Sequence, residues 1–117
     1  MTRLSTLLLL LVLALPAVAQ DTPTTPADMD DVTLFRTFCK GCHSSESEAG
    51  EYSPMDLIMD QWDEVFDAFD ENHAEAITLE ATEGKPVGQF LGEKLLDRLR
   101  AFCIKGAADS EEPMTCG

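Results

Sequence analysis

Residues 39–43 read Cys39-Lys40-Gly41-Cys42-His43, and the predicted fold and function both depend on this stretch. Two thiols three positions apart, followed at once by an imidazole, have the spacing with which a chain attaches haem covalently. The thiols reach the two vinyl groups of the porphyrin from one turn of backbone, and the adjacent imidazole meets the iron from one face. The stretch therefore predicts one covalent haem c, attached through Cys39 and Cys42, with His43 as the proximal axial ligand.

The first 19 residues have the pattern of a secretory signal peptide. Arg3 supplies a positive charge, residues 7–15 are an unbroken apolar run, and Ala17 and Ala19 form a small-residue cleavage site. The apolar run is shorter than the ~20 residues that a membrane-spanning helix needs, although an uncleaved anchor is the competing interpretation. We expect cleavage after Ala19, export to a periplasmic or other extracytoplasmic compartment, and no stable membrane span afterwards.

The mature chain is small and strongly acidic. The 117 residues have a formal net charge of −14, and cleavage removes Arg3, which leaves 22 acidic residues against seven basic ones. A surface of this sign argues against nucleic acid and anionic membranes as partners. It favours a partner protein with a basic docking patch and a salt-sensitive encounter, although the same charge also serves solubility.

Apolar spacing predicts helices on both sides of the motif and no strand. The expected helices run from Pro26 into the motif, from Pro54 to His73, and from Phe90 to Gly106, each with apolar residues three and four positions apart. A weak helix is expected over 74–82, and a loop over 84–88. The expected organisation is a flexible leader at 20–25, one haem domain at 26–106 and a polar tail at 107–117.

A signal peptide, an early helix that ends in C-x-x-C-H and an apolar last helix together resemble a small monohaem c-type cytochrome. The resemblance implies an all-α fold, a small cytochrome c-like bundle of three to four helices around the haem. It implies that Phe35 or Phe38 packs against the apolar face of the last helix. It also implies a protein that carries single electrons between redox partner proteins and is not an enzyme. In this family the second axial ligand is usually a Met in the loop before the last helix, and residues 84–88 contain none.

The sixth iron ligand must then come from elsewhere in the chain. His73 is the only other histidine, and it continues the apolar stripe of the second helix four residues after Phe69. Met55 and Met59 lie on the same stripe and are the rivals, although a Met in such a stripe more often fills a core. Met114, in the tail, is the weakest candidate. An open sixth position is the remaining alternative.

Three classes of function follow from these residues. Two axial side chains on one haem favour electron transfer. An open or weakly held sixth position favours a haem enzyme or a gas-binding sensor. The haem-free alternative uses Cys39 and Cys42 as a redox dithiol, or as zinc ligands with His43 and His73, but no strand or βαβ pattern surrounds the motif and adjacent ligands at 42 and 43 suit structural zinc poorly.

Two further features bear on stability. Cys103 and Cys116 are a spare pair of cysteines in a chain expected to be exported, which predicts a disulfide that tethers the tail to the last helix. Trp62, the single Trp, is expected to fill the core rather than to pack on the haem.

Overall fold

The computed structural model describes residues 25–75 and 80–115, and over these residues the chain is all-α, which confirms the predicted fold class. No strand occurs within them. The helices in chain order are η1 (Pro26–Asp28), α1 (Asp31–Phe38), η2 (Pro54–Asp56), α2 (Met59–Asp67), α3 (Phe69–Asn72), η3 (Glu80–Thr82), α4 (Val87–Leu91) and α5 (Glu93–Lys105), where η denotes a 3-10 helix. The predicted signal peptide at 1–19 lies outside the described residues. Within the described residues, no helix is long and apolar enough to cross a membrane.

The helix that leads into the motif begins later than predicted. Thr25 makes no cap hydrogen bond to the backbone, and Met29 is extended, so that Pro26–Asp28 forms only one 3-10 turn. Asp30 is the true N-cap: its carboxylate accepts a hydrogen bond from the Thr33 amide at 2.8 Å. This bond satisfies an amide that has no partner inside the helix. The predicted continuous helix from Pro26 is therefore wrong, and α1 starts at Asp31.

The predicted continuous helix from Pro54 to His73 is also wrong. Leu57 is extended, with φ −126° and ψ 158°, and it separates η2 from α2. The Trp62 indole donates to the Pro54 carbonyl at 2.7 Å, and this is the carbonyl that Ile58 would need in a continuous helix. A second break at Ala68, with φ −101° and ψ 15°, separates α2 from α3.

The last helix is divided as well. Gly92 has φ +79°, in the left-handed region that glycine tolerates, and it separates α4 from α5. Val87 and Gly88, expected in a loop, are the first two residues of α4. The chain therefore has five α-helices in its described part rather than three to four. Of the weak helix expected over 74–82, residues 76–79 lie outside the described part, and only η3 is helical in the remainder.

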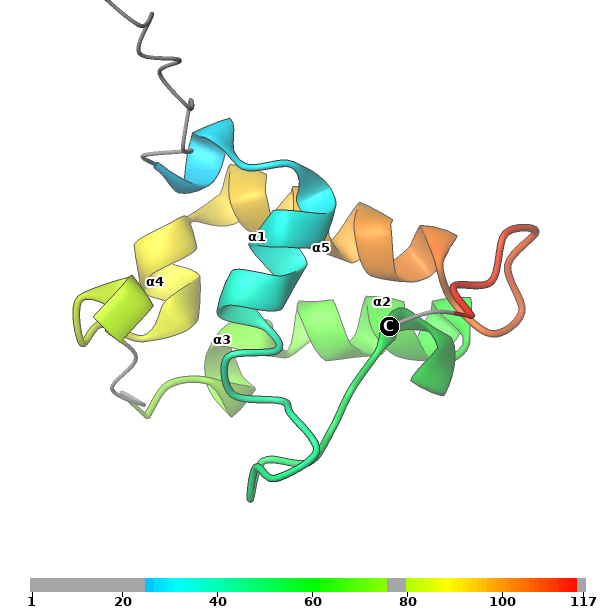
Figure 1. Cartoon of the computed structure of the whole chain (residues 1–117), viewed down its shortest axis with the longest axis horizontal. Coiled ribbons are helices and arrows are strands. Elements are labelled where there is room, and N and C mark those ends of the chain that lie inside the picture. The colour runs from blue at the N-terminus through cyan, green and yellow to red at the C-terminus, as the bar shows by residue number, and fades with distance from the viewer. Residues whose placement is uncertain (1–24, 76–79, 116–117) are drawn as a thin grey trace, which may run out of the picture.

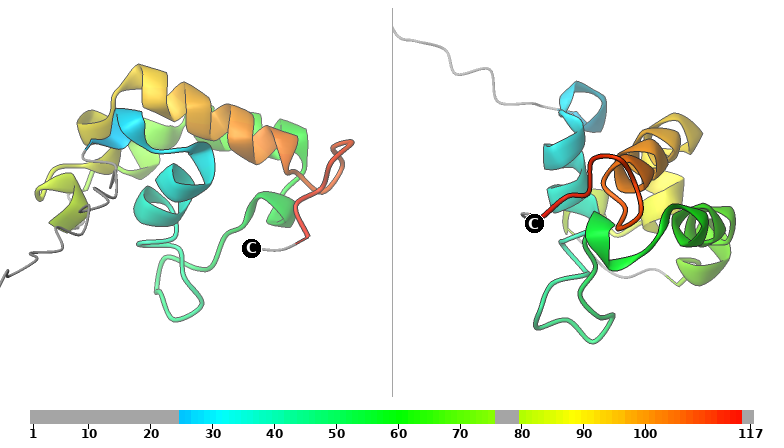
Figure 2. Two further views of the ribbon diagram at one scale, coloured as in Figure 1. Left: turned by 45° about the horizontal axis from the view of Figure 1, so that its top comes forward. Right: turned by 90° about the vertical axis from the view of Figure 1, so that its right-hand side faces the viewer.

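Helix α5 is the centre of the fold, because α1, α2, α4 and η2 all pack against it. Figures 1 and 2 show α5 running along the molecule, with α1 crossing it on one side and α2 lying beside it on another. The expected contact between the first and last main helices is present, since the rings of Phe35 and Phe102 have centres 5.3 Å apart. The buried core consists of Leu34, Phe35, Phe38, Trp62, Leu91, Leu99, Cys103 and Ala107.

Ion pairs at the surface join α5 to the same two neighbours. Arg98 contacts Asp31 of α1 at 2.7 Å, and Arg100 contacts Asp63 and Asp67 of α2 at 2.6 and 2.9 Å. Pairs of this exposure each contribute about 0–1 kcal/mol, so the apolar core remains the main source of stability. Together, the core and these ion pairs hold the C-terminal end of α1 close to α2 and α3. The motif, which follows α1, therefore faces these two helices.

Candidate functional site

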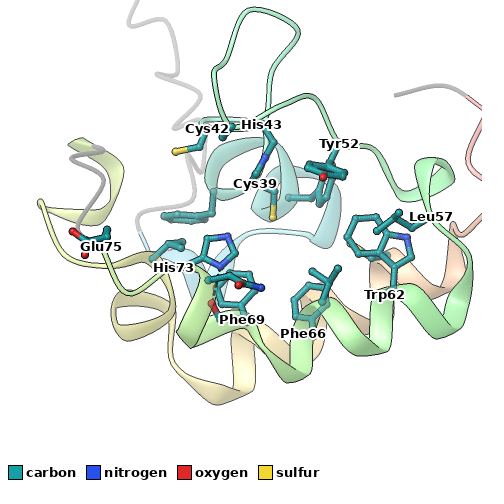
Figure 3. A pocket seen from close by; sticks show the side chains of 17 residues that line it. Cys39, Cys42, His43, Tyr52, Leu57, Trp62, Phe66, Phe69, His73 and Glu75 are labelled. Atoms are coloured by element: carbon teal, nitrogen blue, oxygen red, sulfur yellow. Dashed lines mark hydrogen bonds between the residues drawn. The ribbon is translucent and has the colours of Figure 1, made fainter.

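The five residues Cys39-Lys40-Gly41-Cys42-His43 form the turn that closes α1. The amides of Cys42 and His43 both donate to the Cys39 carbonyl, at 3.2 and 2.8 Å. One turn of backbone therefore presents both thiols and the imidazole to the same cavity, as Figure 3 shows.

This cavity has a volume of about 380 Å³. Ligand sites in proteins typically have volumes of roughly 300–1,000 Å³ and apolar walls with a few polar groups. The exposed residues Tyr52, Asn72 and Glu75 border the cavity where it meets solvent. Its walls are apolar and come from Phe35, Phe38, Leu57, Trp62, Val65, Phe66, Phe69 and Val87. The cavity is thus an apolar site whose notable polar groups are thiols and imidazoles.

Two imidazoles line the same cavity, with their ring planes at 77° to each other. His43 belongs to the turn after α1, whereas His73 is the C-cap residue of α3, and their ring centres are 6.2 Å apart. The break at Ala68 gives α3 its own direction, which brings its end to the cavity opposite the motif (Figure 3). An imidazole nitrogen binds a first-row metal at about 2 Å, so two rings on opposite sides of one metal have centres about 6 Å apart.

A backbone carbonyl fixes each imidazole. Nδ1 of His43 lies 3.0 Å from the Gly50 carbonyl, and Nδ1 of His73 lies 2.7 Å from the Phe69 carbonyl. Because a carbonyl only accepts, the hydrogen of each neutral ring is on Nδ1, and Nε2 keeps its lone pair. This is the arrangement of metal-ligating histidines, whose other ring nitrogen donates to a carbonyl, a carboxylate or water.

The loop after the motif supports His43. Gly50 has φ +83°, a left-handed conformation that suits glycine, and its carbonyl reaches Nδ1 of His43. Tyr52 packs edge-on against the His43 ring, with ring centres 5.1 Å apart and planes at 75°. Sequence reasoning missed Gly50, Tyr52 and Phe69 as site residues. The only signal for Gly50 was its position as a glycine in a polar loop. Its contact with His43 is made by a backbone carbonyl, and every residue type has one.

The thiols lie in surroundings that favour the neutral form. Burial, with a smaller contribution from Cys42, raises the pKa of Cys39 to about 12. Burial also raises the pKa of Cys42, and burial followed by the neighbouring Cys39 raises that of Cys103. Reactive dithiols depend on a lowered thiol pKa, so these environments weigh against the redox-dithiol alternative.

Cys103 lies on α5, is 1% exposed and lines the same cavity as Cys39. Within the described residues, Cys39, Cys42 and Cys103 form no disulfide with one another. Cys116 lies outside the described residues, so the disulfide between Cys103 and Cys116 stays a prediction. Trp62 is 5% exposed and belongs to the core cluster, but it also lines the cavity.

The methionine rivals of His73 lie away from the cavity wall. Met55 is 43% exposed on η2, and Met59 packs against the core at the start of α2; neither lines the cavity. Met114 lines a separate hollow with Val32 and Phe102. Of the four candidates, the fold brings only His73 to the side of the cavity that faces His43.

The side chains of this cavity can be compared with the ligands that a bare metal ion and a haem require. Within residues 25–75 and 80–115, no group of three or more His, Cys, Asp and Glu side chains is placed to hold a metal ion. A haem iron receives four nitrogens from the porphyrin and needs only two axial ligands from the protein. Two thiols on one turn, two opposed imidazoles and apolar walls meet that need.

Comparison of the chain with protein-family models, with curated proteins and with solved structures finds no match. The residues of the cavity and their geometry therefore carry the functional argument.

Proposed function

We propose that this chain is an exported monohaem c-type cytochrome that carries single electrons between partner proteins. Cys39 and Cys42 would bind the haem covalently, with His43 as the proximal ligand and His73 as the sixth ligand. The alternative, a haem enzyme or gas-binding sensor, requires a sixth position that no side chain closes.

The observation that carries the proposal is the pair of opposed imidazoles. Their ring centres are 6.2 Å apart, close to the separation of about 6 Å for two imidazoles that share one metal. Both rings donate from Nδ1 to backbone carbonyls and leave Nε2 for a metal. Two histidines 30 positions apart have the same tautomer and line one cavity that also contains both motif thiols.

When bound, the haem supplies the one-electron redox chemistry, and the chain supplies ligands, burial and charge. The carbonyls of Gly50 and Phe69 hold the two imidazoles in place, so the same two side chains would be available to the iron in both oxidation states. The apolar walls limit water around the site. Exposed Glu75 at the border adds negative charge. Two imidazoles and nearby acids both favour the oxidised iron, so we expect a midpoint potential below that of His/Met cytochromes.

Export and partner choice follow from the sequence. The predicted signal peptide would deliver the chain to an oxidising, extracytoplasmic compartment. The excess of acidic residues would steer it toward a redox partner with a basic docking patch.

The direct test of attachment is the intact mass of the denatured protein after export from a host that attaches haem. We expect residues 20–117 plus the mass of one haem. Replacement of Cys39 or Cys42 by Ser leaves at most one thioether, so attachment should be weakened or prevented and less of the protein should carry haem. Cys103→Ala is the matched control, because its thiol lines the same cavity but lies outside the motif. A purified protein without haem, or with zinc alone, would contradict the proposal.

A further inference from the structure

Phe69 is the residue on which the His73 ring rests. The two rings stack with their centres 4.0 Å apart and their planes 17° apart. The Phe69 carbonyl also accepts the hydrogen bond from Nδ1 of His73 at 2.7 Å. Phe69 thus contacts the imidazole both through its ring and through its backbone carbonyl. Figure 3 shows Phe69 on the side of His73 away from the motif.

The local backbone gives His73 little other support. Helix α3 has only four residues, and His73 itself, with φ −116° and ψ 21°, lies outside helical geometry. A side chain in such a position turns about its two torsions between several rotamers unless neighbouring atoms block them. The flat stack on Phe69 blocks rotations that would move the ring out of its present plane.

Phe69 is in turn fixed by residues of two helices. It is 8% exposed and stacks on Phe66 of α2, with ring centres 5.4 Å apart and planes at 14°. Gly88 of α4 also lies against Phe69. A Cβ atom at Gly88 would lie 3.4 and 3.5 Å from two ring carbons of Phe69, which is ordinary van der Waals contact, and 2.3 Å from Oδ1 of Asp70 at the end of an exposed side chain. The backbone of α4 therefore packs closely against the Phe69 ring.

We propose that Phe69 is a positioning residue that sets the plane of the His73 imidazole and keeps it at the cavity. The proposal rests on the proposed function, because positioning matters only if His73 is an axial ligand. It goes further in that it assigns control of the sixth ligand to the ring stack of Phe66, Phe69 and His73.

The test uses the exported, haem-loaded full chain with Phe69→Leu. Leucine keeps an apolar side chain but removes the flat face on which His73 stacks. We expect a larger high-spin fraction in the ferric spectrum of this variant. Phe69→Leu removes the ring contact but keeps the backbone carbonyl that accepts from Nδ1 of His73. We therefore expect carbon monoxide to bind the ferrous form about 10-fold faster, the lower end of the loss for a hydrogen-bonded outer partner of a metal ligand.

Matched controls separate positioning from general stability. Phe102→Leu removes a ring that pairs with Phe35 and lines the separate hollow. Gly106→Ala introduces a Cβ atom 2.8 Å from that of Pro54, remote from the histidines. Both controls should lower the unfolding temperature, while the spectrum stays low-spin and carbon monoxide binding stays slow.

The outcomes distinguish this inference from the function on which it rests. If Phe69→Leu lowers the unfolding temperature as Phe102→Leu does, yet keeps the spectrum and the carbon monoxide rate of the unaltered protein, Phe69 only fills the core and the inference is overturned. That result leaves an axial His73 intact, provided that the unaltered protein is low-spin and His73→Ala is high-spin. An unaltered protein that is already high-spin overturns both.

Discussion

At the scale of single residues, His73 decides between the two haem-based functions considered for this chain. The centre of its ring lies 6.2 Å from that of His43, and its Nδ1, not its Nε2, contacts the Phe69 carbonyl. In the proposed function, a second imidazole would close the iron to small molecules, which favours electron transfer.

Replacement of His73 by Ala should convert a low-spin haem into a high-spin haem that binds carbon monoxide rapidly. The proximal ligand and the thioethers stay, so the haem should remain attached. Optical spectra of the oxidised and reduced variant measure this change. Met59→Ala is the control, because Met59 packs on the core and does not line the cavity. If Met59→Ala opens the iron while His73→Ala does not, the sixth ligand is the methionine.

The sequence indicated His73 as the sixth ligand, but it revealed only some of the features that support this choice. It was the sole remaining imidazole, and its place on an apolar stripe suggested that it faces inward. The supporting contacts were not readable, because the Gly50 and Phe69 carbonyls belong to backbone that every residue has. The motif itself was readable because its chemistry requires two thiols and an imidazole at fixed spacing.

At the scale of elements, the breaks between helices position the site. A stripe of apolar residues at spacings of three and four predicted one helix from Pro54 to His73, yet the chain breaks at Leu57 and again at Ala68. The first break accompanies the hydrogen bond from the Trp62 indole to the Pro54 carbonyl. This is a contact between separate elements, which the spacing of apolar residues does not encode. Periodicity survives such breaks because both pieces face the same core, so the pattern alone does not reveal them.

The cap of α1 gives a pH-dependent prediction at this scale. Hydrogen bonds from the Thr33 amide and hydroxyl lower the pKa of the Asp30 carboxyl from its ordinary value of 3.8. A group with a lowered folded-state pKa stabilises the fold above its unfolded value, and this contribution is lost as the pH falls through the folded-state pKa. Asp30→Ala should therefore lower the urea midpoint at about pH 6 but hardly at about pH 2.

Asp28→Ala is the control for the cap. Asp28 is an exposed acid three residues from Thr25, and its carboxylate accepts from the Thr25 hydroxyl rather than from a helix amide. We expect a smaller effect at both pH values. Equal losses for Asp28→Ala and Asp30→Ala would show that general charge, and not the cap, is responsible.

At the scale of the whole molecule, α5 supplies the surface on which the other helices pack. The net charge of the chain bears on its encounters with partner proteins. The core around Leu34, Leu99 and Phe35 depends on residues that the apolar pattern had marked. The excess of acidic residues was readable from composition. Composition predicts the sign of the charge on a partner's docking surface, but it does not predict where on this molecule the partner docks.

This charge predicts how electron exchange should respond to salt. The second-order rate with a basic redox protein should fall about 10-fold or more between low and high ionic strength, because salt screens the attraction that steers the encounter. Stopped-flow oxidation of the reduced protein by a basic partner and by an acidic one measures it. Rates with the acidic partner should rise with salt. A rate with the basic partner that is independent of salt would contradict charge-steered docking.

The optical spectrum of the exported protein, oxidised and then reduced under carbon monoxide, tests the central claim most directly. One covalent haem between His43 and His73 predicts low-spin spectra in both oxidation states and little change on addition of carbon monoxide. A spectrum without haem bands, or a high-spin haem that takes up carbon monoxide at once, would contradict the account.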